Sequence, residues 1–190
     1  MNTVKDKVCI DDPDVQQRVF KSLMQAMSRP GIWQALPTGA EPFALLLASL
    51  CDPSAGYADT ENRVDARTRL HIGAPIVNET GAAFVLAAGN DNAASDRQSP
   101  HLGTLDDPHL STTFILVIPE GGKSDSLRLE GPGVSPEGVV FDTGGLHPTW
   151  LERREVWVRN FPLGVDFILI KGASVAALPR TTRILKEDSQ

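Results

Sequence analysis

The chain of 190 residues is 41% hydrophobic and 22% charged, which is typical of a soluble globular protein. Its 18 Lys and Arg residues and 24 Asp and Glu residues give a net charge of −6, which argues against a broad binding surface for nucleic acid. No stretch approaches the roughly eighteen apolar residues of a membrane span, and the first residues lack the apolar core of a signal peptide. We therefore expect a single cytoplasmic domain over residues 1–190, with its core at about 13–185, that binds neither nucleic acid nor a membrane.

The first clear element is a helix over residues 13–28. Asp12 can cap it, and Pro13 suits its first position. Apolar residues recur along it at helical spacing: Val15, Val19, Phe20, Leu23, Met24 and Met27. This pattern predicts an amphipathic helix.

Three further segments of the amino-terminal half carry weaker patterns. Residues 43–51 follow Pro42 and are apolar almost all round, which indicates a short buried helix, although a strand is the alternative. The turn-rich connection after it can hold a short strand at 56–58. Residues 63–75 give a loose helical face that ends at Gly73.

Two continuous apolar runs of strand length, residues 82–88 and 113–118, suit a central sheet that is covered by helices on both faces. Between them, residues 89–109 are polar and rich in turn residues, and we interpret them as a surface excursion with one short helix at most. Residues 126–130 alternate in polarity and are predicted to pair with 113–118 across a hairpin turn at 120–123.

The carboxyl-terminal part begins with an amphipathic helix over residues 148–158. Its apolar anchors are Trp150, Leu151 and Trp157, and an aromatic helix face more often packs on a core than on a partner. Residues 166–171 and 175–178 are predicted to form a last strand pair. The mixture of helices, apolar strands and late hairpins predicts a three-layer α/β sandwich with a mixed central sheet.

Metal binding and disulfide bonds are not indicated by the sequence. Cys9 and Cys51 stand in no paired or metal-ligand spacing, so free thiols are expected. The four histidines are far apart: His71, His101, His109 and His147. Because a metal needs convergent ligands, we expect no metal site.

Residues 120–124, EGGKS, end in the Gly-Lys-Ser of a phosphate-binding loop. Such a loop also needs a glycine at the position that Val117 holds and a helix after Ser124. A strand is predicted there instead, so we interpret the segment as a hairpin turn. No nucleophile elbow of the GxSxG type and no GxGxxG after a strand is present.

Residues 178–184, LPRTTRI, place two arginines and two threonines after a predicted strand. Arginine forks and hydroxyl groups suit a phosphate or carboxylate, and they equally suit a structural salt bridge. A turn delivers Asp166 into an apolar run, where an unpaired charge would be costly. Because adjacent strands would bring the two together, we expect Asp166 to pair with Arg180 or to cap nearby amides.

Five blocks of the sequence together resemble one known family. They are MQAMSRPG at 24–31, LHIGAP at 70–75, LRLEGPGV at 127–134, NFPLGVDFILI at 160–170 and ALPRTTRI at 177–184. Their residues, order and spacing are similar to those of the PhnH family, whose members are subunits of the bacterial carbon–phosphorus lyase system.

The resemblance implies a fold like the large domain of pyridoxal-phosphate-dependent transferases, without that cofactor. It implies an accessory subunit in organophosphonate breakdown that supports formation of alpha-D-ribose 1-methylphosphonate 5-triphosphate from ATP and methylphosphonate, with release of adenine. The radical cleavage of the carbon–phosphorus bond belongs to another subunit of that system, PhnJ. The resemblance also implies a homodimer and assembly with the subunits PhnG, PhnI and PhnJ (G, I and J), with PhnL (L) as a further candidate. The family supplies no established catalytic residue for the PhnH chain, so none is carried over.

Two other functions stay open at this stage. The first is a small-anion site that would help to hold a phosphonate or a nucleotide phosphate. Its candidate residues, which could equally form a structural polar cluster, are Arg180, Thr181, Asp166 and Arg128. The second is a stand-alone pyridoxal-phosphate enzyme, for which only Lys171 lies near a strand end in a core-like segment. We interpret Lys171 as the point where the strand leaves the core, so no cofactor is expected.

Overall fold

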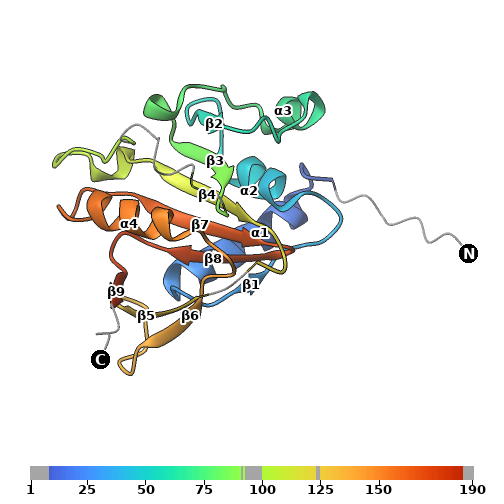
Figure 1. Cartoon of the computed structure of the whole chain (residues 1–190). Helices are drawn as coiled ribbons and strands as arrows, with labels where there is room; N and C mark the ends of the chain where they lie inside the picture. The colour runs from blue at the N-terminus through green and yellow to red at the C-terminus, as the bar shows by residue number, and fades with distance from the viewer. Residues whose placement is uncertain (1–8, 91, 93–99, 123–124, 186–190) are drawn as a thin grey trace, which may run out of the picture.

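A computed structural model describes residues 9–90, 92, 100–122 and 125–185, and its centre is a mixed sheet with helices on both faces (Figure 1). In spatial order the six strands of this sheet are β1 (Gln34–Ala35), β8 (Ser174–Leu178), β7 (Asp166–Lys171), β4 (Thr113–Ile118), β3 (Phe84–Ala88) and β2 (Tyr57–Asp59). Strands β2, β3, β4 and β7 run parallel to one another. Strand β8 pairs antiparallel with both β7 and β1, so β8 alone runs in the opposite direction. The predicted mixed α/β sheet is confirmed.

The helices are α1 (Pro13–Ser28), α2 (Pro42–Leu50), α3 (Ala66–Ile72) and α4 (Pro148–Trp157), with short 3₁₀ turns η1 (Glu79–Gly81) and η3 (Pro108–Leu110). Asp12 caps α1, since its Oδ1 accepts a hydrogen bond from the Asp14 amide at 2.9 Å. Gly73 ends α3 with a φ of 68°, a conformation that glycine adopts without strain. The predicted helices are confirmed, including the short buried helix predicted for residues 43–51.

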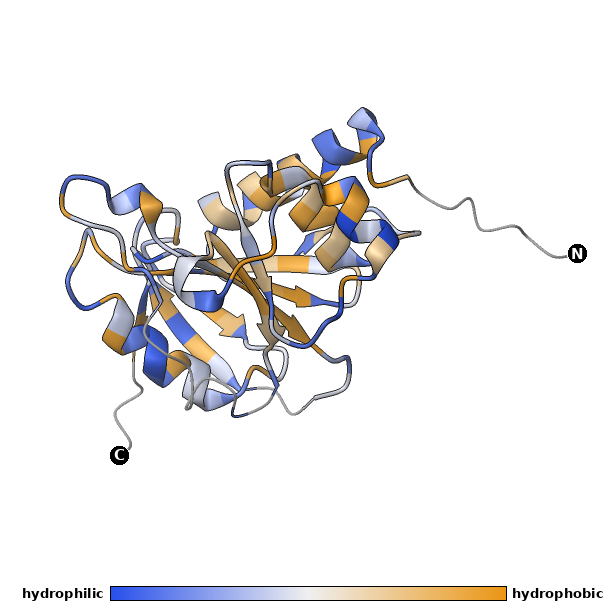
Figure 2. Cartoon of the chain, turned by 90° about the horizontal axis from the view of Figure 1, so that it is seen from above, coloured by the Kyte–Doolittle hydropathy of each residue, from blue (hydrophilic) through white to orange (hydrophobic). Residues whose placement is uncertain are grey.

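The alternation of side chains along the central strands divides the core into two clusters. Ile115 and Ile168 face α1 and α2 on one side, and Phe114 and Phe167 face α4 on the other. Figure 2 shows the hydrophobic residues concentrated on the central strands and the adjoining helix faces. The ring of Phe114 stacks on Trp157 with centroids 5.2 Å apart, so the aromatic face of α4 belongs to the core.

Helix α1 buries less of its apolar pattern than its periodicity suggests. Val15, Val19 and Leu23 are buried, whereas Phe20 and Met24 are about half exposed. These two positions lie on the side of the helix that faces away from the sheet. The apolar pattern therefore locates the helix correctly and overstates the width of its buried face.

The predicted pairing of residues 126–130 with 113–118 is wrong. Strand β5 (Ser126–Glu130) instead joins β6 (Val139–Asp142) and β9 (Arg183–Leu185) in a separate antiparallel sheet. The physical reason is that β4 already has β3 on one edge and β7 on the other, which leaves no edge for a third partner. Figure 1 shows the small sheet beside the end of the central sheet that β1 and β8 form.

The segment EGGKS falls partly outside the described residues, because Lys123 and Ser124 are not among them. The next described element is β5, so a strand follows the glycines, as predicted, and the helix of a phosphate-binding loop does not. Within the predicted excursion 89–109, residues 91 and 93–99 also lie outside the described part. Among the described helices, none is long and apolar enough to cross a membrane.

Candidate functional site

The turn of residues 160–165 brings Asp166 to the first position of β7. Gly164 allows this turn to lie against the end of α4, because a Cβ at this glycine would lie 3.1 Å from the Val158 Cα. The Gly164 amide donates a hydrogen bond to the Leu102 carbonyl at 2.9 Å. As a result, the amino end of β7 lies beside the excursion that precedes β4.

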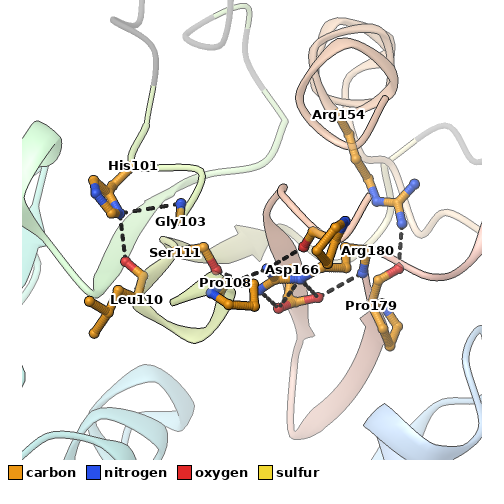
Figure 3. A network of polar contacts seen from close by, with 10 residues as sticks. His101, Gly103, Pro108, Leu110, Ser111, Arg154, Asp166, Pro179 and Arg180 are labelled. Atoms are coloured by element: carbon orange, nitrogen blue, oxygen red, sulfur yellow. Dashed lines mark hydrogen bonds and ion pairs between the residues drawn. The ribbon is translucent and has the colours of Figure 1, made fainter. Parts of the chain in front are cut away.

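Asp166 and Arg180 form the ion pair that the sequence predicts (Figure 3). Arg180 Nη2 lies 2.6 Å from Asp166 Oδ2, and Arg180 Nε lies 3.3 Å and 3.2 Å from the two carboxylate oxygens. The Arg180 backbone amide also donates to Asp166 Oδ1 at 2.6 Å. The pair is mostly buried, with the two side chains 16% and 15% exposed, so Asp166 is at once the partner of the guanidinium and a cap for the turn.

The remaining donors of Arg180 are also used. Nη1 donates to the carbonyls of Pro108 at 2.9 Å and Pro162 at 3.4 Å, and Nη2 donates to Ser111 Oγ at 2.5 Å. We call this set, Arg180 with Asp166, Ser111, Pro108 and Pro162, the Arg180 hub. A guanidinium has only five N–H donors. Because the hub supplies an acceptor for each of them, Arg180 has no donor left for an incoming anion.

The hub lies at the amino ends of the parallel strands. Asp166 is the first residue of β7 and is in register with Thr113, the first residue of β4. Ligands of open α/β sheets bind at the carboxyl ends of the strands. The position of the hub therefore gives no support for an anion pocket there.

The other two predicted site residues do not join this ion pair. Thr181 lies in the same turn as Arg180, and its carbonyl closely approaches Gly131 at the end of β5, where a Cβ would be 2.7 Å away. Arg128 is exposed on β5, and its Nη2 donates to the Glu137 carbonyl at 3.1 Å. The structure thus brings together Asp166 and Arg180, places Thr181 next to them in the chain, and puts Arg128 in the small sheet.

Arg154 is a buried polar residue that the sequence analysis missed. It is only 2% exposed, and its Nη2 donates to the carbonyls of Pro179 at 2.5 Å and Thr182 at 3.0 Å. Its Nε has no hydrogen-bond partner within the described part of the chain, and neither has Thr182 Oγ1. Burial lowers the pKa of Arg154 to about 10, whereas the negative charge of Asp166 acts to raise this pKa. Its place between Trp150 and Trp157 on one helix face was the signal that could have identified it.

A cavity of about 580 Å³ lies away from the hub, between the start of α2 and helix α3. Arg67, Thr68 and His71 line one side of it, and His71 Nδ1 contacts the carboxylate of Asp11. None of the predicted site residues lines this cavity. In the described part of the chain, no group of three or more histidine, cysteine or acidic side chains could hold a metal ion.

The fold and the hub together define an α/β protein with a mixed sheet whose polar cluster is closed on itself. The chain belongs to the PhnH family: the family described as "Bacterial phosphonate metabolism protein (PhnH)" matches residues 9–185. The family expected from the sequence blocks is therefore confirmed.

Two relatives extend this finding. A protein of Stutzerimonas stutzeri, named "Putative C-P lyase subunit protein HtxG", is 38% identical over 170 residues, which cover 89% of this chain and 85% of that protein. A protein of Rhizobium meliloti (strain 1021), named "Alpha-D-ribose 1-methylphosphonate 5-triphosphate synthase subunit PhnH", is 32% identical over 197 residues, which cover 90% of each chain. The chain is thus similar to these proteins over nearly its whole length.

Proposed function

We propose that the chain is an accessory subunit of the carbon–phosphorus lyase system and supports formation of alpha-D-ribose 1-methylphosphonate 5-triphosphate from ATP and methylphosphonate. The observation that carries this proposal is the similarity to a subunit of that synthase over 90% of both chains. Membership of the PhnH family over residues 9–185 supports it.

The proposal gives the Arg180 hub a structural role. Its donors are all directed to acceptors of the chain itself, from segments that are far apart in sequence. The hub thereby fastens the excursion before β4, the turn before β7 and the turn after β8 to one another. The alternative, a small-anion site at Arg180, Thr181, Asp166 and Arg128, would require Arg180 to give up some of these bonds.

The finer features of the proposal concern partners and location. We propose a homodimer that assembles with PhnG, PhnI and PhnJ, with PhnL as a further candidate, as part of a transferase complex in the cytoplasm. We also propose that the mixed sheet follows the large domain of pyridoxal-phosphate-dependent transferases while the chain acts without that cofactor. Free thiols at Cys9 and Cys51 suit a reducing compartment.

Co-purification tests the subunit role. The chain, carrying an affinity tag, would be expressed with PhnG, PhnI and PhnJ of the same organism, and the captured proteins would be weighed by native mass spectrometry. We expect a complex that contains all four chains. Recovery of the tagged chain alone, under conditions in which the other three assemble, would reject the proposal.

Calorimetry tests the small-anion alternative separately. Isolated wild-type chain would be titrated with ATP and with methylphosphonate, and the Arg180→Met variant would serve as the matched control. The proposal predicts no binding heat for either ligand with either protein. Saturable heat that is lost in the variant would favour the anion site instead.

A further inference from the structure

The cavity of about 580 Å³ between the start of α2 and helix α3, which we call the α2–α3 cavity, has two walls of different chemistry. The start of α2 contributes Glu41 together with Ala40 and Ala44, and α3 contributes Arg67 and His71. The volume lies within the range of pockets that hold small organic molecules. The polar groups of such pockets orient the ligand, so their charges indicate which class of molecule fits.

The segment before α1 forms a further boundary of the cavity, because Ile10 also lines it. Gln16 Nε2 donates to the Ile10 carbonyl at 3.2 Å, and the Asp11 carboxylate contacts His71 Nδ1. These contacts connect the segment to α1 on one side and to α3 on the other. The cavity is therefore bounded by segments that the chain itself holds in place.

Two charged side chains of the cavity are free for a ligand. Asp65 is not one of them, since its Oδ1 accepts the Thr68 amide at 2.7 Å as the cap of α3. Glu41 stands at the same position before α2, but its side chain makes no capping hydrogen bond. The Arg67 guanidinium forms no hydrogen bond or ion pair within the described part of the chain. One wall thus offers a free carboxylate and the other a free guanidinium.

This pair of opposite charges selects against ligands that carry one charge alone. A simple anion at Arg67 would share the cavity with the negative charge of Glu41, and a simple cation at Glu41 would share it with Arg67. A molecule with both an ammonium group and an oxyanion satisfies both walls with charge-assisted hydrogen bonds. An apolar body between its charged ends would lie against the side chains of Ala40, Ala44 and Ile10.

We propose that the α2–α3 cavity binds a small zwitterion, in which an apolar body joins an ammonium group to an oxyanion; ω-amino acids are the simplest members of this class. The ammonium group pairs with Glu41 and the oxyanion with Arg67. The inference goes beyond the proposed function, since neither ATP nor methylphosphonate carries an ammonium group. It is consistent with calorimetric titrations in which those two ligands give no heat.

A titration of the isotopically labelled full chain, followed by the NMR shifts of its amides, tests this inference. The probes are 6-aminohexanoate, hexanoate and hexylamine, which share one hydrocarbon body and differ in their charged ends. We expect 6-aminohexanoate to shift the amides of Ala44 and Thr68 saturably and to bind at least about tenfold more tightly than either other probe. Absence of saturable shifts at these amides, or equal affinities for the three probes, would overturn the inference.

Two variants assign the charged ends of the ligand. Arg67→Gln should bind 6-aminohexanoate no more tightly than hexylamine, and Glu41→Gln should bind it no more tightly than hexanoate. The matched control is Arg18→Gln, at an arginine of α1 outside the cavity, and it should keep the wild-type preference. All three positions are exposed, so each variant is expected to fold, and its amide spectrum checks this. A cavity variant that keeps the preference for the zwitterion, or a control that loses it, would reject the assignment.

Discussion

Arg180, which is mostly buried, and Arg154, which is fully buried, both bind the turn between β8 and β9, and they differ in how well their donors are satisfied. Arg180 is 16% exposed and directs its donors to a carboxylate, a hydroxyl and two carbonyls. Arg154 is only 2% exposed, yet its Nη2 contacts two carbonyls and its Nε has no partner in the described part of the chain. We therefore expect the contribution of each arginine to the free energy of unfolding to depend more on its hydrogen-bond partners than on its depth of burial.

The largest effect is expected on removing the Arg180 side chain. Arg180→Met leaves the Asp166 carboxylate buried without its partner and removes the donors for Ser111 Oγ and two carbonyls, so the free energy of unfolding should fall by about 3 kcal/mol. Urea denaturation measures this. Arg128→Met, at an exposed arginine with one hydrogen bond to a carbonyl, is the control and should cost less than about 1 kcal/mol. Equal losses in the two variants would contradict the account.

The coupling between Asp166 and Arg180 should be the next largest effect. A double-mutant cycle with Asp166→Ala and Arg180→Ala is expected to give an interaction free energy of about 2 kcal/mol, since the two side chains contact each other directly in a mostly buried site. If the losses of unfolding free energy in the two single variants add up to the loss in the double variant, the two side chains are not coupled.

Arg154→Met should be milder than Arg180→Met, although Arg154 is the more buried residue. Two carbonyls lose a donor, but a poorly solvated charge is removed at the same time, so the net loss should be about 1 kcal/mol. The comparison of the two methionine variants by urea denaturation is the measurement. A larger loss at Arg154 would reverse the ranking of the two arginines.

The smallest effect is expected at Thr182. Its Oγ1 is buried without a hydrogen-bond partner in the described residues, so Thr182→Val, which keeps the shape, should leave the unfolding free energy within about 0.5 kcal/mol or raise it. Thr112→Val is the matched control, because Thr112 Oγ1 is also buried but donates to the Ala82 carbonyl at 3.0 Å. If Thr182→Val clearly lowers the unfolding free energy and Thr112→Val does not, the Thr182 hydroxyl must have a hydrogen-bond partner after all.

Much of the fold follows from short-range patterns in the sequence. The continuous apolar runs at β3 and β4 and the capped periodic helix α1 define their elements locally, because burial on a given face fixes the spacing of apolar residues. Strand β5 is different. Its alternation predicts a strand but not a partner, and the partner depends on whether β4 has a free edge, which is a property of the whole sheet.

The hub was predicted only in part for the same reason. Asp166 is the first residue of β7, and Arg180 follows the end of the neighbouring strand β8. Their ion pair could therefore be expected from the adjacency of the two strands. Arg180 is separated from its partners Pro108 and Ser111 by about 70 residues in the sequence. Because the segment of these partners has no periodic pattern, the sequence does not predict the two contacts. Those contacts decide whether Arg180 has a donor free for a ligand.

The most direct test of a structural hub is the activity of the assembled complex that contains Arg180→Met. The complex with PhnG, PhnI, PhnJ and PhnL would be purified at a temperature at which the variant chain is folded, its stoichiometry checked by native mass spectrometry, and adenine release from ATP and methylphosphonate measured per assembled complex. If Arg180 has only a structural role, the rate should lie within about twofold of the wild type. A rate at least about tenfold lower in a complex of unchanged stoichiometry would contradict this role, because Arg180 would then act on the substrate.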